Sequence, residues 1–508
     1  MKMYKSLFGV LAGFAVLFAL CEVWANICLT KGSFAGMVEY AFVVLVIWLI
    51  VNRFASDPHG VFSRYEVWFA MLFCLLFHLT IVYLAPTAMG QHGQPWDSMT
   101  SCKALSMGGI AYRHYPNEVY WINYEVLLTT LGCLFSPTAV TGQWLNAVCC
   151  ALTIFPMFKI SDLVAGRRVT RLVMLLVILS PALAIYSTAL VGDFVAAMFA
   201  TYALFFVLKM FETPQMTRSS FVHVLFAGIC LSLFNTFKSI HFLLFFGVLA
   251  ALTFMLVRGY EWRKSAKFLV KIVVVLFVVM ATSSVVNDVI HAVVRIPPAK
   301  QKFLDGVVYE LILGLNLETR GCWNRPLATS IRPMDLGDKL KLLGAAIKRD
   351  KRAYPGLVKD KFKTQYGTHK SGSSFCDWFV ISTCDDPYAK QGRRHCPPWV
   401  WLWADNGYLL FSAILVLGAL GFCFLVKESL SALLPGIIAW VVVLGFVIMS
   451  LCIEGHGRYK CVAYPFFFLT MPYVVGLRVP IQKAGAYLAA KCETARRKIA
   501  TKFQSAGK

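Results

Sequence analysis

Long apolar runs with few charges divide this chain, and they restrict it to a fold that spans a membrane. The candidate spans lie at 7–29, 34–51, 67–85, 140–160, 171–191, 193–211, 221–237, 240–257, 268–286, 403–425, 431–452 and 460–477. A helix rises about 1.5 Å per residue, so runs of this length cross roughly 27–30 Å of hydrocarbon. The sequence therefore predicts an all-α polytopic membrane protein with about twelve transmembrane helices.

Composition excludes the soluble classes of protein. Hydrophobic residues make up 58% of the 508 residues and charged residues only 15%, whereas soluble domains carry about 25% charged residues. The net charge of +23 would suggest nucleic acid in a soluble protein. Here the basic residues lie between and after apolar runs, as membrane topology and anionic lipids require. We therefore expect membrane lipids, and no nucleic acid, among the partners.

The basic residues also orient the spans. They gather in three loops and the tail, at Arg53, Arg64, Arg167, Arg168, Arg171, Arg258, Arg263, Lys264, Lys267, Lys491, Arg496, Arg497, Lys498, Lys502 and Lys508. By the positive-inside rule these regions are cytoplasmic. Both termini are then inside, the first span is a retained helix, and the outer segments are 86–120, the Gly192-Asp193 turn, 287–402 and 454–459. The short run Tyr124–Phe135 should be re-entrant or interfacial, because the number of crossings around it must be odd.

The spans and loops predict five regions. They are two additional N-terminal transmembrane helices at 1–66, a core at 67–286 with the first outer loop at 86–120, a small extracytoplasmic domain at 287–402, C-terminal transmembrane helices at 403–480 and a basic cytoplasmic tail at 481–508. The extracytoplasmic domain contains a Lys/Arg-rich helical stretch near 339–363. It also holds Cys322, Cys376, Cys384 and Cys396, for which disulfides are expected over zinc outside the cytosol; their pairing stays open.

Acids at the outer ends of spans are the first candidates for chemistry. Asp97 follows Pro95-Trp96 in the first outer loop, and Asp193 follows Gly192 at the start of a span. Each has a plain structural interpretation as a carboxylate that faces water. A carboxylate held at the bilayer surface can instead act as a base on a substrate.

Cations near the outer leaflet are the second group of candidates. Glu454, His456, Arg458 and Tyr459 form a tight polar turn between apolar runs, and Lys238 interrupts two others. Arginine suits bidentate recognition of phosphate, and an intramembrane cation is a functional candidate by default. The alternatives are a surface ion pair in the turn and a snorkelling lysine.

Taken in order, these segments resemble the GT-C superfamily of membrane glycosyltransferases, in the branch that includes protein O-mannosyltransferases and the lipid A aminoarabinose transferase. The resemblance covers roughly 67–477 and suggests a bacterial protein. It is carried by Asp97 with Ala104-Leu105, Gly109 and Tyr112, by Ser180-Pro181 and Asp193, by Gly314-Leu315-Asn316 and Gly321-Cys322-Trp323-Asn324, and by Glu454, Arg458-Tyr459 and Pro465. Two features depart from the family pattern: the additional N-terminal spans, and a single acid in place of an acidic pair in the first loop.

The resemblance implies an inverting transfer of a sugar from a polyprenyl-phosphate donor to an acceptor hydroxyl of a glycan, lipid or protein at the extracytoplasmic face. Such transfer needs a base for the acceptor proton and cations for the departing phosphate. Asp97 is the expected base. Arg458 and Lys238, with His456 assisting, are expected at the phosphate, and the other predicted substrate-binding residues are Tyr459, Glu454, Asp193 and Tyr112. No cofactor is certain, and the single acid of the first loop puts a requirement for a divalent metal in doubt.

Two other functions are open to a polytopic chain of this kind. A transporter or flippase of lipid or polysaccharide would suit about twelve spans with both termini inside, but the chain has no internal repeat and has one large asymmetric outer loop. A polysaccharide polymerase or ligase would concentrate Arg and His in that large loop, whereas the most distinctive acid here, Asp97, is in the first one. The absence of an Asn-x-Ser/Thr sequon favours a bacterial plasma membrane.

Overall fold

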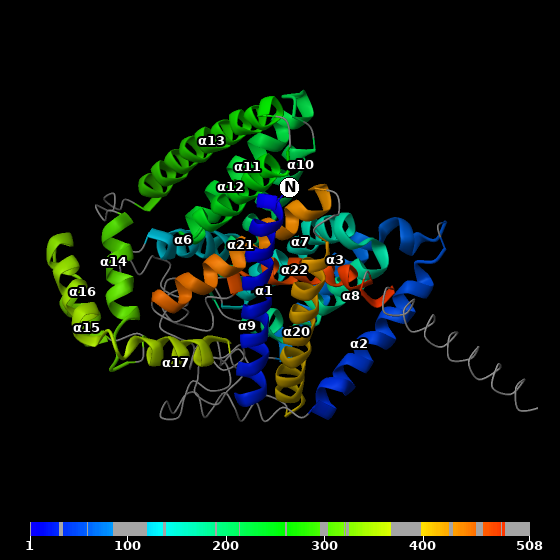
Figure 1. Cartoon of the computed structure of the whole chain (residues 1–508), viewed down its shortest axis with the longest axis horizontal. Helices are drawn as coiled ribbons and strands as arrows, with labels where there is room; N and C mark the ends of the chain where they lie inside the picture. Colours follow the sequence, from blue (N-terminus) through cyan, green and yellow to red (C-terminus); the bar gives the residue numbers. More distant parts are fainter. Residues whose placement is uncertain are drawn as a thin grey trace, which may run out of the picture.

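The structure is a bundle of α-helices with a group of shorter helices at one side (Figure 1). It is a computed structural model, and it describes residues 2–29, 34–57, 59–84, 119–135, 139–187, 190–212, 214–259, 262–294, 303–319, 321, 325–366, 398–425, 430–453, 461–478 and 480–482. Within these residues the regular structure is helical and contains no strand. The prediction of an all-α protein is confirmed.

The helices keep the order of the apolar runs. They are α1 (Lys2–Leu29), α2 (Phe34–Phe54), α3 (Val61–Leu84), α6 (Val119–Leu134), α7 (Ala139–Ala165), α8 (Arg167–Ile178), α9 (Pro181–Tyr186), α10 (Asp193–Phe211), α11 (Arg218–Phe237), α12 (Phe242–Val257), α13 (Trp262–Val294), α14 (Phe303–Gly314), α15 (Arg325–Ile331), α16 (Leu336–Asp350), α17 (Tyr354–Tyr366), α20 (Pro398–Phe424), α21 (Leu430–Cys452), α22 (Tyr464–Thr470) and the 3-10 helix η3 (Met471–Leu477). In the described residues, ten helices are long and apolar enough to cross a membrane. The protein is a multi-pass membrane protein.

The span expected at 171–191 differs from the other spans because it consists of two short helices. The chain forms α8 and then, after Leu179 and Ser180, α9. Pro181 is the first residue of α9; it has no N–H to donate and disfavours a helical conformation at Ser180. The break therefore follows from the Ser180-Pro181 pair. The apolar run α12 is likewise shorter than the other spanning helices.

The short run that was expected to be re-entrant or interfacial forms α6, a helix of 16 residues. The Asn123 side chain near its start donates a 2.8 Å hydrogen bond to the carbonyl of Thr236, in the last turn of α11. This contact places the N-terminal half of α6 beside the C-terminal end of a membrane-spanning helix.

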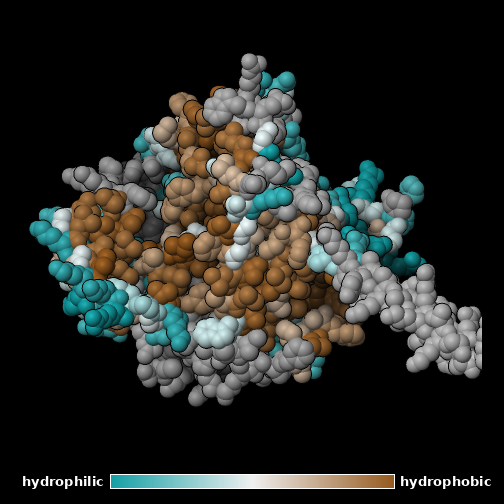
Figure 2. Space-filling model, in the orientation of Figure 1, coloured by the Kyte–Doolittle hydropathy of each residue, from teal (hydrophilic) through white to brown (hydrophobic). Residues whose placement is uncertain are grey.

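Burial separates the helices at the centre from those at the surface of the bundle. All seven residues of α22 are buried, whereas Phe42 of α2 and Phe277 of α13 are about two-thirds exposed. Figure 2 shows apolar surface over the helices, with hydrophilic residues gathered over α15 and α16 and at the turn between α2 and α3. An apolar surface between two polar regions is the distribution that a bilayer requires.

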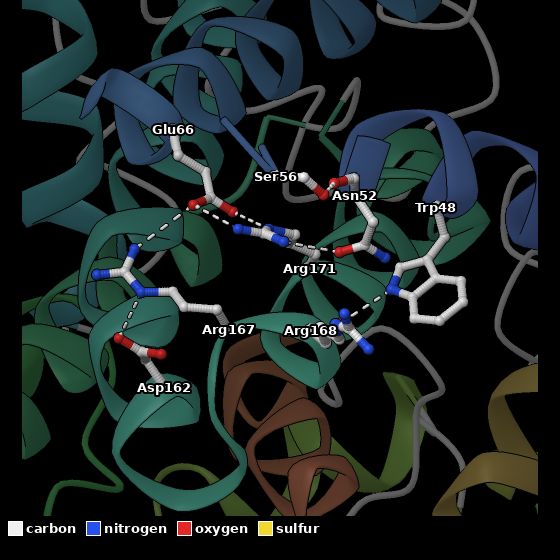
Figure 3. A network of polar contacts seen from close by, with 8 residues as sticks. All are labelled: Trp48, Asn52, Ser56, Glu66, Asp162, Arg167, Arg168 and Arg171. Atoms are coloured by element: carbon white, nitrogen blue, oxygen red, sulfur yellow. Dashed lines mark hydrogen bonds and ion pairs between the residues drawn. The ribbon is translucent and has the colours of Figure 1, made fainter. Parts of the chain in front are cut away.

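One end of the bundle, which we call the Arg171 end, carries a network of charges (Figure 3). Arg171 of α8 grips Glu66 of α3 with two nitrogens, at 2.5 and 3.3 Å, and donates to Asn52 of α2 at 2.8 Å. Arg167 lies 3.5 Å from Glu66 and 2.9 Å from Asp162. Glu66 is buried, so its carboxylate depends on these arginines for compensation. The network ties α2, α3, α7 and α8 together.

Candidate functional site

At the other end of the bundle, two charged residues singled out from the sequence meet. The ammonium of Lys238 lies 2.8 Å from Oδ1 of Asp193, and the two side chains are only 16% and 4% exposed. They are 45 residues apart in the chain, but α10 and α11 form a hairpin, so the start of one helix lies beside the end of the other. We call this end of the bundle the Lys238 end.

Helix dipoles favour both charges at these positions. Asp193 is the first residue of α10, where the N–H groups make a positive end. Lys238 follows the last residue of α11, where the carbonyls make a negative end, and its own backbone is extended. Each ion therefore stabilises the terminus that carries it, and the pair needs less compensation from water than isolated buried ions would.

Gly192 allows this turn to pack closely. A Cβ at this position would lie 3.3 Å from the Cβ of Tyr124 in α6, tighter than ordinary contacts. Gly192 precedes Asp193 and is buried with it. The glycine thus lets the first turn of α10 lie against α6, and the α6 neighbour Asn123 is fixed in turn on α11.

His241 is a further polar residue at this end that the sequence reasoning passed over. It lies between α11 and α12, its Nδ1 is buried, and that nitrogen has no hydrogen-bond partner among the residues described. Its position three residues after Lys238, near the start of the apolar run 240–257, is a signal in the sequence.

The chain that follows α21 returns to the same end. A small apolar hollow lies between the turn after α11 and helices α12, α21 and the start of α22. It is lined by Phe234, Ile240, Leu243, Leu244, Val442, Phe446, Val462, Ala463 and Phe466. Val462 and Ala463 therefore pack near the turn that carries Lys238. Ile453, which directly follows α21, belongs to that helix's outer end by the topology expected above.

Six of the predicted site residues lie outside the described residues. They are Asp97, Tyr112, Glu454, His456, Arg458 and Tyr459. Cys322, Cys376, Cys384 and Cys396 lie outside them too. The structure thus brings together two of the eight predicted site residues, Asp193 and Lys238, and their roles remain predictions.

The described residues do not fit a metal site. They contain no group of three or more His, Cys, Asp and Glu side chains that could hold an ion. The carboxylate of Asp193 already forms an ion pair with the ammonium of Lys238.

Comparison with known proteins identifies similar structures but no related sequence. No family model and no curated protein matches the chain. Among solved structures, it is similar to the oligosaccharyltransferase AglB from Archaeoglobus fulgidus in complex with an inhibitory peptide and a dolichol-phosphate, at a TM-score of 0.45 and 13% identity, over 85% of this chain and 52% of that chain. It is also similar to the A. fulgidus oligosaccharyltransferase in complex with Zn and sulfate. That comparison has a TM-score of 0.44 and 15% identity, and it covers 83% of this chain and 51% of that chain.

A bacterial structure is similar as well. ArnT from Cupriavidus metallidurans bound to undecaprenyl phosphate gives a TM-score of 0.37 and 13% identity, over 82% of this chain and 78% of that chain. The chain spans about half the length of the two archaeal chains. These neighbours are GT-C membrane glycosyltransferases, the superfamily that the sequence resembles.

Proposed function

We propose that the protein is a glycosyltransferase that moves a sugar from a polyprenyl-phosphate donor to an acceptor hydroxyl at the extracytoplasmic face of the membrane. The observation that carries the proposal is the buried Asp193–Lys238 pair at the Lys238 end. A lysine at an end of the membrane-spanning helices supports the proposal, because the phosphates of membrane lipids lie at the ends of such helices. The neighbouring structures that bind dolichol-phosphate or undecaprenyl phosphate are compatible with such a donor.

In the proposed reaction the acceptor oxygen attacks the anomeric carbon. A new C–O bond forms, the bond from that carbon to the phosphate oxygen breaks, and the configuration inverts. Asp97 takes the proton of the acceptor hydroxyl, and polyprenyl phosphate leaves with the bonding electrons. Lys238 and Arg458, with His456, stabilise the charge that develops on the phosphate.

Asp193 has a supporting role in this scheme. Its carboxylate lies on one side of the Lys238 ammonium and so fixes the direction of the long, flexible lysine side chain. An ammonium has three N–H donors, and such a group can contact a carboxylate and a phosphate at the same time. Glu454, Tyr459 and Tyr112 are proposed to contact the substrate.

Direct binding of the lipid tests the role of Lys238. We expect Lys238→Met to weaken the binding of undecaprenyl phosphate about ten- to hundredfold, because a charge-assisted hydrogen bond to the phosphate is lost. Native mass spectrometry of the purified protein with graded amounts of the lipid measures this. Lys271→Met is the matched control, since Lys271 is also a buried lysine of the bundle but donates to the carbonyl of Met210. Equal loss in both variants would assign the effect to general destabilisation.

The side of the membrane is tested by labelling. A single cysteine at Lys351, an exposed position just after α16, is expected to react with an impermeant thiol reagent in intact cells. A single cysteine at Arg168, exposed at the Arg171 end, should react only after permeabilisation. Both variants are made in a background without the native cysteines. The reverse pattern would place the Lys238 end in the cytoplasm and contradict the proposed site.

A further inference from the structure

The helices α14, α15, α16 and α17, which we call the outer helices, include a buried lysine that joins the C-terminal ends of α14 and α21. Lys361 lies in α17 and is only 2% exposed. Its ammonium donates to the carbonyl of Gly314, the last residue of α14, at 3.1 Å, and to the carbonyl of Ile453, the residue after α21. α14 belongs to the outer helices and α21 to the transmembrane bundle, so one side chain connects the two parts.

The electrostatics of helix ends explain why a cation is buried here. The last carbonyls of a helix have no partner within the helix and carry a partial negative charge. A buried ammonium is costly unless its donors are used. Lys361 satisfies both requirements at once, because its two identified acceptors are terminal carbonyls of different helices.

Two glycines let the backbones approach closely enough for this contact. A Cβ on Gly314 would overlap the backbone of Ile453. Gly321 has a φ of +73°, which favours glycine, and a Cβ there would lie 2.9 Å from Cδ of Lys361. The joint is therefore built from direct backbone packing, with the lysine stem filling the space beside Gly321.

The outer helices otherwise have their own small core. It consists of Val308, Tyr309, Ile312, Leu313, Ala328, Ile331 and Leu343, from α14, α15 and α16. Figure 1 shows these three helices beside one another, with α17 running from them toward α1. Phe362 of α17 packs against Phe18 of α1, with ring centroids 6.2 Å apart. Because these helices have a separate core, they need specific contacts to the transmembrane bundle. Lys361 makes one of these contacts.

We propose that Lys361 is a positioning residue that locks the outer helices onto the C-terminal end of α21. This inference extends the proposed function, because Ile453 is the point from which the chain leaves α21 toward Glu454. By fixing both carbonyls, Lys361 makes the end of α21 and the end of α14 a single rigid unit at the extracytoplasmic side.

Hydrogen exchange of the full-length protein in nanodiscs tests the joint without requiring activity. Lys361→Met keeps the length of the side chain and removes its charge and donors. We expect the amides of Leu315, whose partner is Leu311, and of Ile453, whose partner is Met449, to exchange about ten- to hundredfold faster. The amides of α10 should be unchanged.

Lys339→Met is the matched control. Lys339 is also 2% exposed and lies in the same group of helices, but it pairs with Asp305 of α14 at 2.8 Å. Its loss should speed exchange within α14 and α16 and leave Ile453 protected. Unchanged exchange at Ile453 in Lys361→Met, or equal exposure of Ile453 in both variants, would overturn the proposal.

A second variant keeps the proposal testable if Lys361→Met does not fold. Gly321→Ala retains the ammonium, but its Cβ would displace the carbonyl of Gly314 and crowd the stem of Lys361, so it should produce the same exchange pattern at Leu315 and Ile453. In transfer assays Lys361→Met should raise the KM for the donor about tenfold or more with a smaller change in kcat, whereas Lys339→Met should leave both near wild type. If the wild-type protein transfers no sugar, the proposed function fails while the exchange result still decides the role of Lys361.

Discussion

Asp97→Asn is expected to transfer the sugar about 10²–10⁴ times more slowly than the wild-type protein, because general-base catalysis contributes a factor of that size. The substitution keeps the shape of the side chain and removes its ability to accept the hydroxyl proton. Donor binding should be unchanged, so kcat should fall while the KM for the donor stays within a small factor. Initial rates with purified protein and a polyprenyl-phosphate sugar measure this.

The same assay distinguishes Asp97 from Asp193, the other acid proposed for the site. Asp193→Asn removes the partner of Lys238, so its main effect should be on donor binding rather than on proton transfer. Near-wild-type turnover by Asp97→Asn would remove Asp97 from the reaction and leave Asp193 as the next candidate base. The expression and thermal stability of both variants serve as controls for folding.

Glu66→Gln is expected to destabilise the protein by about 3–5 kcal/mol, the loss that follows when one partner of a buried ion pair is removed. Glu66 is the buried carboxylate that compensates Arg171 and contacts Arg167 (Figure 3). Glutamine keeps an acceptor oxygen but leaves the guanidinium of Arg171 without a counter-charge. Thermal unfolding in nanodiscs should show a clearly lowered midpoint.

Glu212→Gln is the control for that experiment. Glu212 pairs with Lys209, but these side chains are 55% and 38% exposed. Exposed pairs contribute at most about 1 kcal/mol. A similar decrease of the unfolding midpoint in both variants would mean that the burial of Glu66 adds nothing to stability. That result would contradict the role assigned to Glu66.

The membrane-spanning helices could be predicted from the sequence because the bilayer leaves the backbone few choices. Apolar runs must satisfy their own hydrogen bonds, so they become helices. The Ser180-Pro181 pair indicates the break in the sequence, since a proline ends a helix at the preceding residue. The prediction of one continuous span at 171–191 is therefore wrong in this respect. Hydropathy alone does not register where an apolar run is interrupted.

The candidate site could be predicted only in part. Asp193 and Lys238 stood out as charges in apolar surroundings, and their contact follows from a hairpin of two helices of nearly equal length, 19 and 20 residues. The joint at Lys361 had no such signal. Its acceptors are backbone carbonyls 47 and 92 residues away, and no side-chain pattern marks them.

The central claim is the transfer reaction, and the most direct measurement is transfer itself. The purified wild-type protein in nanodiscs is mixed with a panel of polyprenyl-phosphate sugars and with candidate acceptors taken from envelope glycans, lipids and proteins; mass spectrometry then detects the glycosylated product and the released polyprenyl phosphate. We predict that at least one donor yields both products in equal amounts, and that Asp97→Asn and Lys238→Met reduce them. Two results together would contradict the proposal and establish the transporter alternative. The wild-type protein would release no polyprenyl phosphate from any donor, and lipid-linked sugars would move across the membrane of reconstituted vesicles.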